Sequence, residues 1–341
     1  MTEYTPALQW ISIEAIGPAF TPPRPLPRRA RLQFDLAYVH RFEVGEDAIP
    51  LLRRHAPQAR VLFNTADLHY LRLERGARLS GAPAELEHAQ RVRERELAVI
   101  KAADCTLVCN SHEMEILRRE VPGAALHYLP WVIEVEQRPV PDFDAREGFL
   151  SLGGFGHPPN EDAVRYFVSE IMPIVRRLLP GVPFHVYGSK LPDELRELAA
   201  PDVIIEGFAP DLRAVFDRHR VTIAPLRYGA GFKGKVATSL AHGVPVVASP
   251  IAAEGTGLQD NQQLLVASEP IAFARALQRL YTDRKVWERL SGGGQAYLRV
   301  NYSFEHGRAL FLRFMKVSRS HAGAIATTVG AVRYLDALSK E

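Results

Sequence analysis

The chain has 341 residues, which favours two domains of ordinary size. Its hydrophobic content of 47% is that of a globular protein, and a net charge of +3 spread along the chain argues against a nucleic-acid-binding protein. No apolar run approaches the ~20 residues of a membrane-spanning helix, and residues 1–11 lack the apolar core of a signal peptide. We therefore expect a cytoplasmic protein, and contact with the inner face of a membrane stays open.

The first 33 residues are predicted to be irregular, because residues 21–31 are rich in proline and arginine. Strands and helices are then expected to alternate. The predicted strands are 34–39, 60–64, 105–109 and 126–129, and the predicted helices are 47–56, 83–103 and 112–120, the last one capped by Ser111. This alternation predicts a parallel sheet covered on both faces. Cys105 and Cys109 are expected to be buried and reduced, and Glu113 to be a solvated charge near a helix end.

A polar break at residues 134–147 divides the chain, and a second α/β run begins after it. The predicted strands are 148–152, 184–188, 203–207, 221–224, 245–248 and 264–266. One predicted helix is capped by Asn160 and ends at Leu179. The other predicted helices are 212–218, 236–242, 271–281 and 284–301. We therefore assign residues 34–140 to a first Rossmann-like domain, 141–306 to a second, and 307–341 to a helical tail.

One stretch of the second domain, Pro225–Ser249, carries most of the functional signal. A buried strand is followed by a loop with three glycines and two lysines, Gly229–Lys235, and then by a short helix that ends at Gly243. Ligands of parallel sheets bind where such loops meet a helix N-terminus, because backbone N–H groups there can approach an anion. The pattern predicts a site for the diphosphate of a nucleotide-linked substrate.

Several sequence motifs of the second half resemble those of the donor domain of GT-B glycosyltransferases, specifically the large retaining family four. These motifs are FLSLGGFGHPPN at 149–160, APLRYGAGFKGKVATSLAHGVPVVAS at 224–249, LLVA at 264–267 and YSF at 302–304. The first half is similar to the later part of the family's acceptor domain, through NTADLHYLR at 64–72, ADCTLVCNSHEMEIL at 103–117 and LPWVIEV at 129–135.

The resemblance implies transfer of a sugar from a nucleotide-diphosphate sugar to the hydroxyl of a glycan or lipid-linked acceptor, in surface polysaccharide or other glycan assembly. Neither a metal nor any other cofactor is expected, since loop amides and ammonium groups can stabilise the leaving diphosphate. Carried over residue by residue, the donor diphosphate would contact Gly153, Gly154, Gly231, Phe232, Lys233 and Lys235. Thr238 and His157 would contact the ribose or the sugar, and Asp67 and His69 would lie at the reacting centre.

The chain departs from the family in two respects. The positions of the family's usual glutamate pair hold Ala230 and Thr238, and nearby Glu254 is a candidate substitute. The first domain is also shorter than usual. Three functions therefore stay open: an active transferase, a non-catalytic or partner-dependent relative whose first domain another chain completes, and a nucleotide-sugar epimerase of the same fold. No G-x-G-x-x-G opens a first βα unit, which argues against a nicotinamide dehydrogenase.

Overall fold

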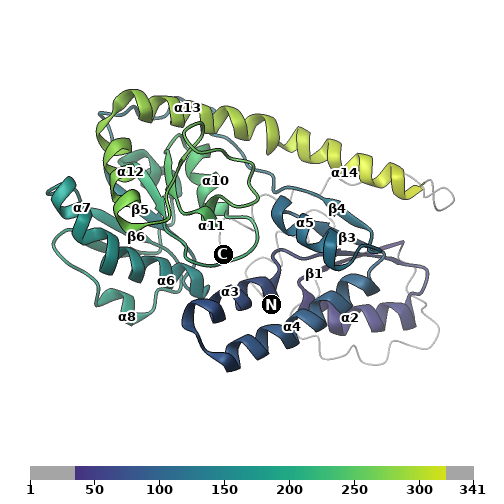
Figure 1. Ribbon diagram of the computed structural model, residues 1–341. Coiled ribbons are helices and arrows are strands. Elements are labelled where there is room, and N and C mark those ends of the chain that lie inside the picture. The colour runs from purple at the N-terminus through teal and green to yellow at the C-terminus, as the bar shows by residue number, and fades with distance from the viewer. Residues whose placement is uncertain (1–34, 320–341) are drawn as a thin grey trace.

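A computed structural model describes residues 35–319, so the irregular segment predicted at 1–33 and the end of the predicted tail lie outside the described residues. The described chain forms two α/β units that lie side by side, each built on one parallel sheet (Figure 1). The prediction of parallel sheets is confirmed. The polypeptide passes from the first sheet to the second through residues 129–146.

The first sheet has the order β1-β2-β3-β4, all parallel. Its strands are β1 (Leu36–His40), β2 (Arg60–Asn64), β3 (Cys105–Val108) and β4 (Leu126–Tyr128), and the helices between them are α2 (Phe42–His55), α3 (His69–Ser80), α4 (Pro83–Ala102) and α5 (Ser111–Glu120). Parallel crossovers are nearly always right-handed, so a sheet in sequential order receives its connecting helices on one face. Accordingly Phe63 and Val108 point into one core with Val92 of α4 and Leu117 of α5.

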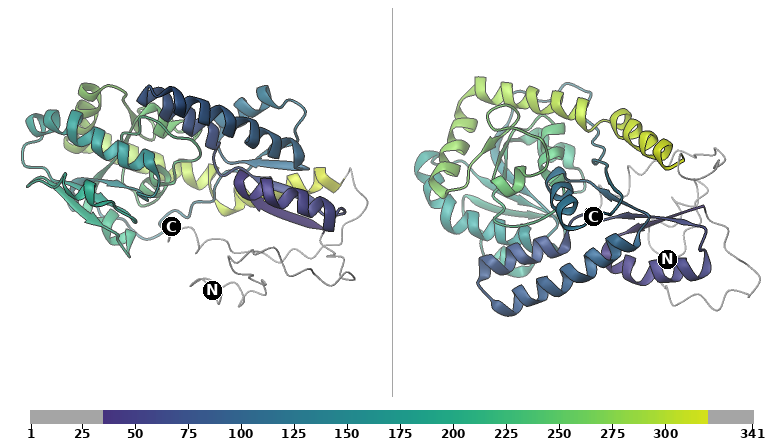
Figure 2. Two further views of the ribbon diagram at one scale, coloured as in Figure 1. Left: turned by 90° about the horizontal axis from the view of Figure 1, so that it is seen from below. Right: turned by 45° about the vertical axis from the view of Figure 1, so that its right-hand side comes forward.

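The other face of the first sheet is covered by the end of the described chain. Helix α13 (Arg284–Asn301) is followed by α14 (Phe304–Arg319), which leads from the second unit back to the first (Figures 1 and 2). Phe314 of α14 packs on Leu62 and Leu107, which point away from α4 and α5. The predicted C-terminal helix therefore begins at Phe304 and helps to cover the first sheet.

The second sheet has the order β10-β9-β8-β5-β6-β7, again all parallel. Its strands are β5 (Glu147–Leu152), β6 (Phe184–Tyr187), β7 (Val203–Gly207), β8 (His219–Ala224), β9 (Val246–Ala248) and β10 (Leu265–Val266). The order reverses at β5, which pairs with β6 on one side and with β8 on the other. The point between the carboxyl ends of β5 and β8 is thus the topological switch point, where ligands of such sheets bind.

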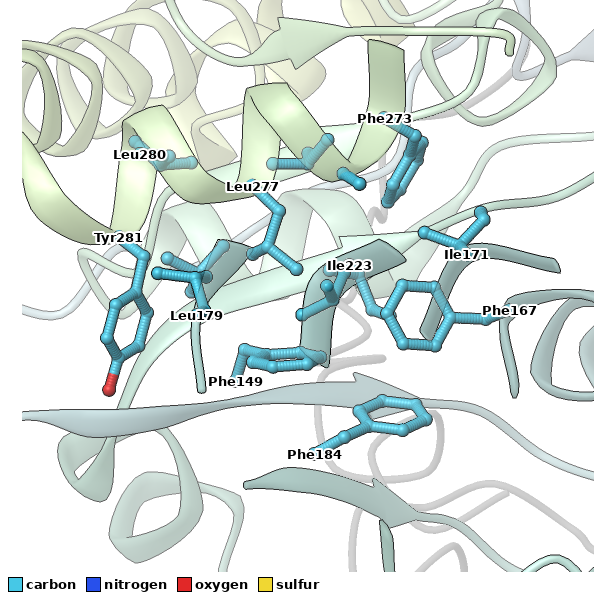
Figure 3. Packing of buried hydrophobic residues seen from close by; sticks show 14 of the residues in the cluster. Phe149, Phe167, Ile171, Leu179, Phe184, Ile223, Phe273, Leu277, Leu280 and Tyr281 are labelled. Atoms are coloured by element: carbon cyan, nitrogen blue, oxygen red, sulfur yellow. The ribbon is translucent and has the colours of Figure 1, made fainter. Parts of the chain in front are cut away.

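Helices cover both faces of this second sheet. They are α6 (Pro158–Tyr166), α7 (Met172–Leu178), α8 (Asp193–Arg196), α9 (Leu212–Arg218), α10 (Gly234–Ala241), α11 (Pro250–Ala253), α12 (Pro270–Thr282) and α13. Phe149 and Phe184 of the sheet pack against Phe167 and Phe273 of the helices (Figure 3). Each buried phenylalanine contributes about 1.5–3 kcal/mol of hydrophobic free energy, so this cluster holds the sheet and its loops in a fixed arrangement.

Three local predictions are wrong. Asn110, not Ser111, caps α5, since its Oδ1 accepts hydrogen bonds from the amides of His112 and Glu113. Asn160 does not cap α6, which begins at Pro158, and the helix predicted to run to Leu179 is interrupted by a π-helical turn at Phe167–Ile171. Helix α3 was not predicted, because its sequence is short and mostly polar and its N-terminus is capped from another helix.

Both cysteines are free and buried, as expected. Burial raises the pKa of the Cys105 thiol to about 11 and that of Cys109 to about 12, so both stay protonated near neutral pH. They contribute to packing and not to reactivity.

Candidate functional site

Two glycine-bearing loops meet at the switch point of the second sheet. Gly153 and Gly154 directly follow β5, and the loop at 225–233 directly follows β8. Asn160 joins them: its Nδ2 donates to the carbonyl of Gly154 at 2.8 Å, and its Oδ1 accepts from Nζ of Lys235 at 2.5 Å. The structure thus brings Gly153, Gly154 and Lys235, all expected at the diphosphate, to one place.

The ammonium group of Lys235 is held without a carboxylate partner among the described residues. Burial, followed by the charge of Lys233, lowers the pKa of Lys235 to about 7. An anion beside it would favour the charged form and raise the pKa again. This spot is therefore electrostatically prepared for a phosphate group.

The first unit presents Asp67 opposite these loops. A tight turn follows β2, in which Oδ1 of Asn64 accepts from the amide of Ala66 and Ala66 adopts a φ of 60°. The turn places Oδ2 of Asp67 2.9 Å from Nε of Arg72. Burial alone would raise the pKa of Asp67, but the charges of Arg72 and His69 outweigh it and the pKa is lowered. Asp67 is therefore ionised at neutral pH.

His69 is the first residue of α3, and its environment comes from α4. The N-cap residue Leu68 has no side-chain acceptor, so the buried carboxylate of Glu96 accepts from the amides of His69 and Tyr70. Nδ1 of His69 lies 3.5 Å from Oδ1 of Asp67. Burial would lower the pKa of His69, but Glu96 and Asp67 outweigh it and the pKa is raised. The predicted pair Asp67 and His69 is thus in mutual contact.

His157 faces the same space from the second unit. Burial, followed by the charges of Arg72 and of both loop lysines, lowers its pKa to about 4, although Asp67 opposes this shift. A neutral imidazole at pH 7 can accept as well as donate a hydrogen bond. It is therefore suited to a sugar hydroxyl, in keeping with its predicted role.

Gly231 lies in the interface between the two units. Its amide donates to Oε1 of Glu113, and its carbonyl accepts from Nδ2 of Asn110 at 2.9 Å and from Nζ of Lys233 at 2.8 Å. A Cβ at this position would lie 2.6 Å from Cβ of Asp67. Gly231 and Lys233, both expected at the diphosphate, are thus held by first-unit groups and by the loop itself.

Glu113 is fully buried, and the expectation of a solvated charge is wrong. Burial raises the pKa of its carboxyl group, which the amide of Gly231 and the charge of Lys233 partly oppose. Burial likewise lowers the pKa of Lys233, and Glu113 opposes that shift. The protonation states of these two buried groups are therefore coupled across the interface, although no ion pair joins their side chains in the described residues.

Glu254 does not replace the missing glutamates in this arrangement. Its two carboxylate oxygens each lie 2.8 Å from an Nη atom of Arg75, on α3 of the first unit. Nε2 of His112 lies 3.3 Å from the same carboxylate, and Arg75 also donates to the carbonyl of Gly229. Glu254 is thus a link between the units.

The remaining predicted positions lie around this interface. Ala230 is buried in the core of the first unit. Phe232 is packed between Trp131 and Tyr302, with ring centroids 5.5 and 5.2 Å away. Thr238 lies on α10, three residues beyond Lys235, and is partly buried. The structure therefore keeps Thr238 beside the lysine but gives Phe232 an aromatic packing role.

A cavity of about 420 Å³ opens beside Asp67 and His69, and we call it the arginine cavity. The cationic and imidazole side chains that line it are Arg41, Arg72, Arg95, His69, His88 and His157. Phe42, Leu73, Val92 and Pro158 supply apolar surface, and Glu43 supplies a carboxylate. The cavity lies between the starts of α2, α3 and α6 and the middle of α4, so both units form it.

Asn110, Glu113, Glu96 and Arg75 belong to this site in the structure but were not expected there from the sequence. One local signal existed, because Asn110-x-x-Glu113 has the spacing of a capping box ahead of an apolar helix face. In the structure Glu113 turns away from that box and contacts Gly231, 118 residues later in the chain. Contacts between segments so far apart leave no pattern in a local window.

The described residues lack two features, a metal-binding cluster and a membrane-spanning helix. Between residues 35 and 319, no group of three or more His, Cys, Asp and Glu side chains is arranged to hold a metal ion. None of the helices in that part of the chain is long and apolar enough to cross a membrane. The absence of a metal from the reaction stays a prediction.

Comparison with known proteins agrees with this geometry. Residues 146–283 match the family "glycosyl transferases group 1". A Klebsiella pneumoniae protein described as an uncharacterized 44.6 kDa protein in the cps region is 23% identical over 162 residues, which are 45% of this chain and 42% of that protein. The chain therefore spans less than half the length of this curated relative.

Solved structures share the fold over most of the chain. Sucrose-phosphate synthase from Thermosynechococcus elongatus superposes with a TM-score of 0.66 and 18% identity, over 84% of this chain and 73% of that one. HepE from Anabaena, in complex with UDP and glucose, superposes with a TM-score of 0.63 and 11% identity, over 84% and 78%. The two-unit α/β architecture is thus the GT-B fold.

Proposed function

We propose that the chain is a retaining glycosyltransferase that moves a sugar from a nucleotide-diphosphate sugar to an acceptor hydroxyl. One observation carries this proposal. Within the region that matches the glycosyl transferases group 1 family, both glycine-bearing loops and Lys235 meet at the switch point, directly opposite Asp67 and His69. The relative from a cps region supports a place in surface polysaccharide assembly.

In this proposal each group has a defined part. Lys235 and the amide of Gly154 stabilise the charge that develops on the leaving diphosphate, while Gly153, whose own amide donates to the carbonyl of Tyr187, lets the diphosphate approach the turn. Neutral His157 contacts a sugar hydroxyl, and Thr238 contacts the ribose. Ionised Asp67 orients the acceptor hydroxyl, with His69 as its neighbour. No step is assigned to a metal, so transfer should continue in the presence of a chelator.

The direct test is ligand binding by the purified chain. Uridine, guanosine, adenosine and thymidine diphosphates and their sugars are screened by thermal shift, where ligand at 100 times Kd adds about 2.7 kcal/mol of stability. Lys235→Met should abolish the shift, because the ammonium group that meets the diphosphate is lost. Lys285→Met, at an exposed position on α13, serves as the matched control. Equal shifts in both variants would remove Lys235 from the site.

Chemistry is tested next, with the nucleotide sugar that gives the shift. Proton NMR of the transferred sugar reports its anomeric configuration, and an inverted product would reject the retaining assignment. Epimerised donor formed without any acceptor would favour the epimerase instead.

A non-catalytic or partner-dependent protein is the second candidate, and a specific observation favours it. The amide of Gly231 is bonded to Glu113 and is not available to a ligand in this arrangement, and Lys233 is buried with its ammonium group donating to the carbonyl of Gly231. Ala230 and Thr238 also lack the carboxylates that the family resemblance leads one to expect. Sugar transfer by the purified chain alone would rule this candidate out.

A further inference from the structure

The arginine cavity has an excess of hydrogen-bond donors. Arg41 has no ion-pair partner within residues 35–319. Arg72 uses only Nε for Asp67, which leaves both of its Nη groups, and Arg95 uses Nε and one Nη for Glu46, which leaves the other. A guanidinium group carries five N–H donors and no acceptor. The lining therefore offers many donors to a ligand, against the single carboxylate of Glu43.

The backbone at the cavity mouth adds to this excess. Arg41 stands directly before α2, and no side chain caps the helix, so its first amides lack a side-chain acceptor. Arg41 also has a φ of 70°, a conformation that costs a non-glycine residue about 1–3 kcal/mol. Glycine would relieve that strain, yet the position holds a residue whose guanidinium group lines the cavity.

The size and position of the cavity fit one sugar unit. Its volume of about 420 Å³ lies within the usual range of small-molecule sites. Leu73 and Pro158 supply apolar surface for a ring face, whereas Phe42 is covered on one face by Arg95, 5.5 Å from its ring centroid, and thereby holds that guanidinium group in the lining. His69 and His157 line the cavity and also adjoin the donor loops. A group bound here would have a neighbouring hydroxyl close to Asp67.

We propose that the arginine cavity is the acceptor subsite and that it selects an acceptor carrying an oxyanion, either a phosphate or a carboxylate, near the reacting hydroxyl. The assignment of this cavity to the acceptor rests on the proposed function, whereas the binding of an oxyanion in the cavity can be tested separately. Arg41 is the specificity-determining residue, because its guanidinium group is not committed to any carboxylate of residues 35–319. A neutral sugar would offer these guanidinium groups, of which Arg41 and Arg95 are exposed and Arg72 is half-buried, only hydrogen bonds without charge assistance and would bind more weakly.

The test uses the full chain and isothermal titration calorimetry without nucleotide. The probes are glucose 6-phosphate, glucuronate, inorganic phosphate and glucose. We expect at least one of the sugar oxyanions to bind at least about tenfold more tightly than glucose, since charge-assisted hydrogen bonds are roughly twice as strong as neutral ones. Which of the two sugars binds more tightly identifies phosphate or carboxylate as the recognised group.

Arg41→Gly should weaken binding of that oxyanion by about ten- to a hundredfold, which is the loss of one charge-assisted pair. Folding should not suffer, because glycine accepts the φ of 70°. Arg54→Gln, an exposed arginine on the same helix outside the cavity, should bind like the unchanged chain. Three results would each overturn the inference. They are an oxyanion affinity no higher than the affinity for glucose, an oxyanion affinity that is the same in Arg41→Gly as in the unchanged chain, and no binding of any charged probe.

Nucleotide binding by the same proteins separates the two proposals. Arg41→Gly should bind the nucleotide diphosphate as the unchanged chain does, since Arg41 is not among the residues of the donor loops. A chain that binds nucleotide without oxyanion selectivity would retain the proposed function and lose the acceptor subsite. Oxyanion selectivity in a chain that binds no nucleotide would have the reverse meaning.

Discussion

Replacing Gly231 by alanine tests whether the loop after β8 is clamped between the two units. Gly231 has a φ of 72°, and an added Cβ would lie 2.6 Å from Cβ of Asp67 and 3.2 Å from the carbonyl oxygen of Ala66. The left-handed conformation alone costs alanine about 1–2 kcal/mol. Overpacking of a well-filled site adds about 1–3 kcal/mol. We therefore expect Gly231→Ala to lower the free energy of unfolding by about 2–5 kcal/mol.

A second glycine separates these two contributions. Gly81, after α3, has a φ of 71°, and a Cβ there would meet nothing within 4 Å. Gly81→Ala thus carries the conformational cost without the clash, and Gly231→Ala should lose about 1–3 kcal/mol more. The effect of alanine on the unfolded chain is the same at both positions and cancels in the difference.

The assay is urea unfolding followed by far-ultraviolet circular dichroism and by tryptophan fluorescence, to which Trp131 beside the loop contributes. If the units separate to relieve the clash, small-angle scattering will show a larger radius of gyration in Gly231→Ala only. A larger loss of stability in Gly231→Ala than in Gly81→Ala, or a larger radius of gyration, would each locate Gly231 in the interface. Equal losses in the two variants, with unchanged dimensions in solution, would refute the reasoning.

Three further predictions concern buried charges. The pKa of Glu113 is raised from 4.5 to about 8, so the folded chain binds an extra proton between these pH values and its stability falls as pH rises through that window. Glu113→Gln should remove this part of the pH dependence of the unfolding free energy, measured by urea unfolding at several pH values. An unchanged pH dependence would contradict the assignment. Diphosphate binding near pH 8 should take up a proton, because an anion raises the pKa of Lys235 from about 7. Calorimetry in buffers of different ionisation enthalpy measures this proton uptake. Uptake that persists in Lys235→Met would point to another group. Arg146 is fully buried and donates to the carbonyls of residues 141, 216 and 242, so Arg146→Met should cost about 3–5 kcal/mol of stability. The exposed control Arg218→Met should change stability by no more than about 0.5 kcal/mol. Similar values for both variants would show that the buried guanidinium group is dispensable.

Much of the candidate site could be predicted from local sequence. The glycine turn at Gly153 and Gly154 and the loop with Lys235 each follow an apolar run of strand length, so their place at a strand end follows from a window of about ten residues. The pairing of Asp67 with His69 is likewise local, since only Leu68 stands between them. What local reasoning could not supply is the partner of each group, as Asn160 for Lys235 and Glu96 for His69 show.

Glu113 illustrates the limit most clearly. Its sequence neighbourhood is that of a polar helix start, where a carboxylate normally faces water and favours the helix dipole. In the folded chain the second unit covers it, and its pKa and its contact with Gly231 follow from that burial. The same burial determines whether Lys233 can reach a ligand, so the assignment of Lys233 depends on the domain arrangement and stays a prediction.

The sequence by itself determined the two runs of alternating strands and helices, the glycine loops and the cationic residues beside them, because apolar periodicity and backbone chemistry act over short distances. Only the tertiary structure decided the reversal of strand order at β5, the return of α14 to the first sheet and the cavity between α2, α3 and α6. These features join segments about 250 residues apart, as the contact between Leu62 and Phe314 shows. Such contacts form because separate apolar faces must be buried together, and no single segment encodes its distant partner.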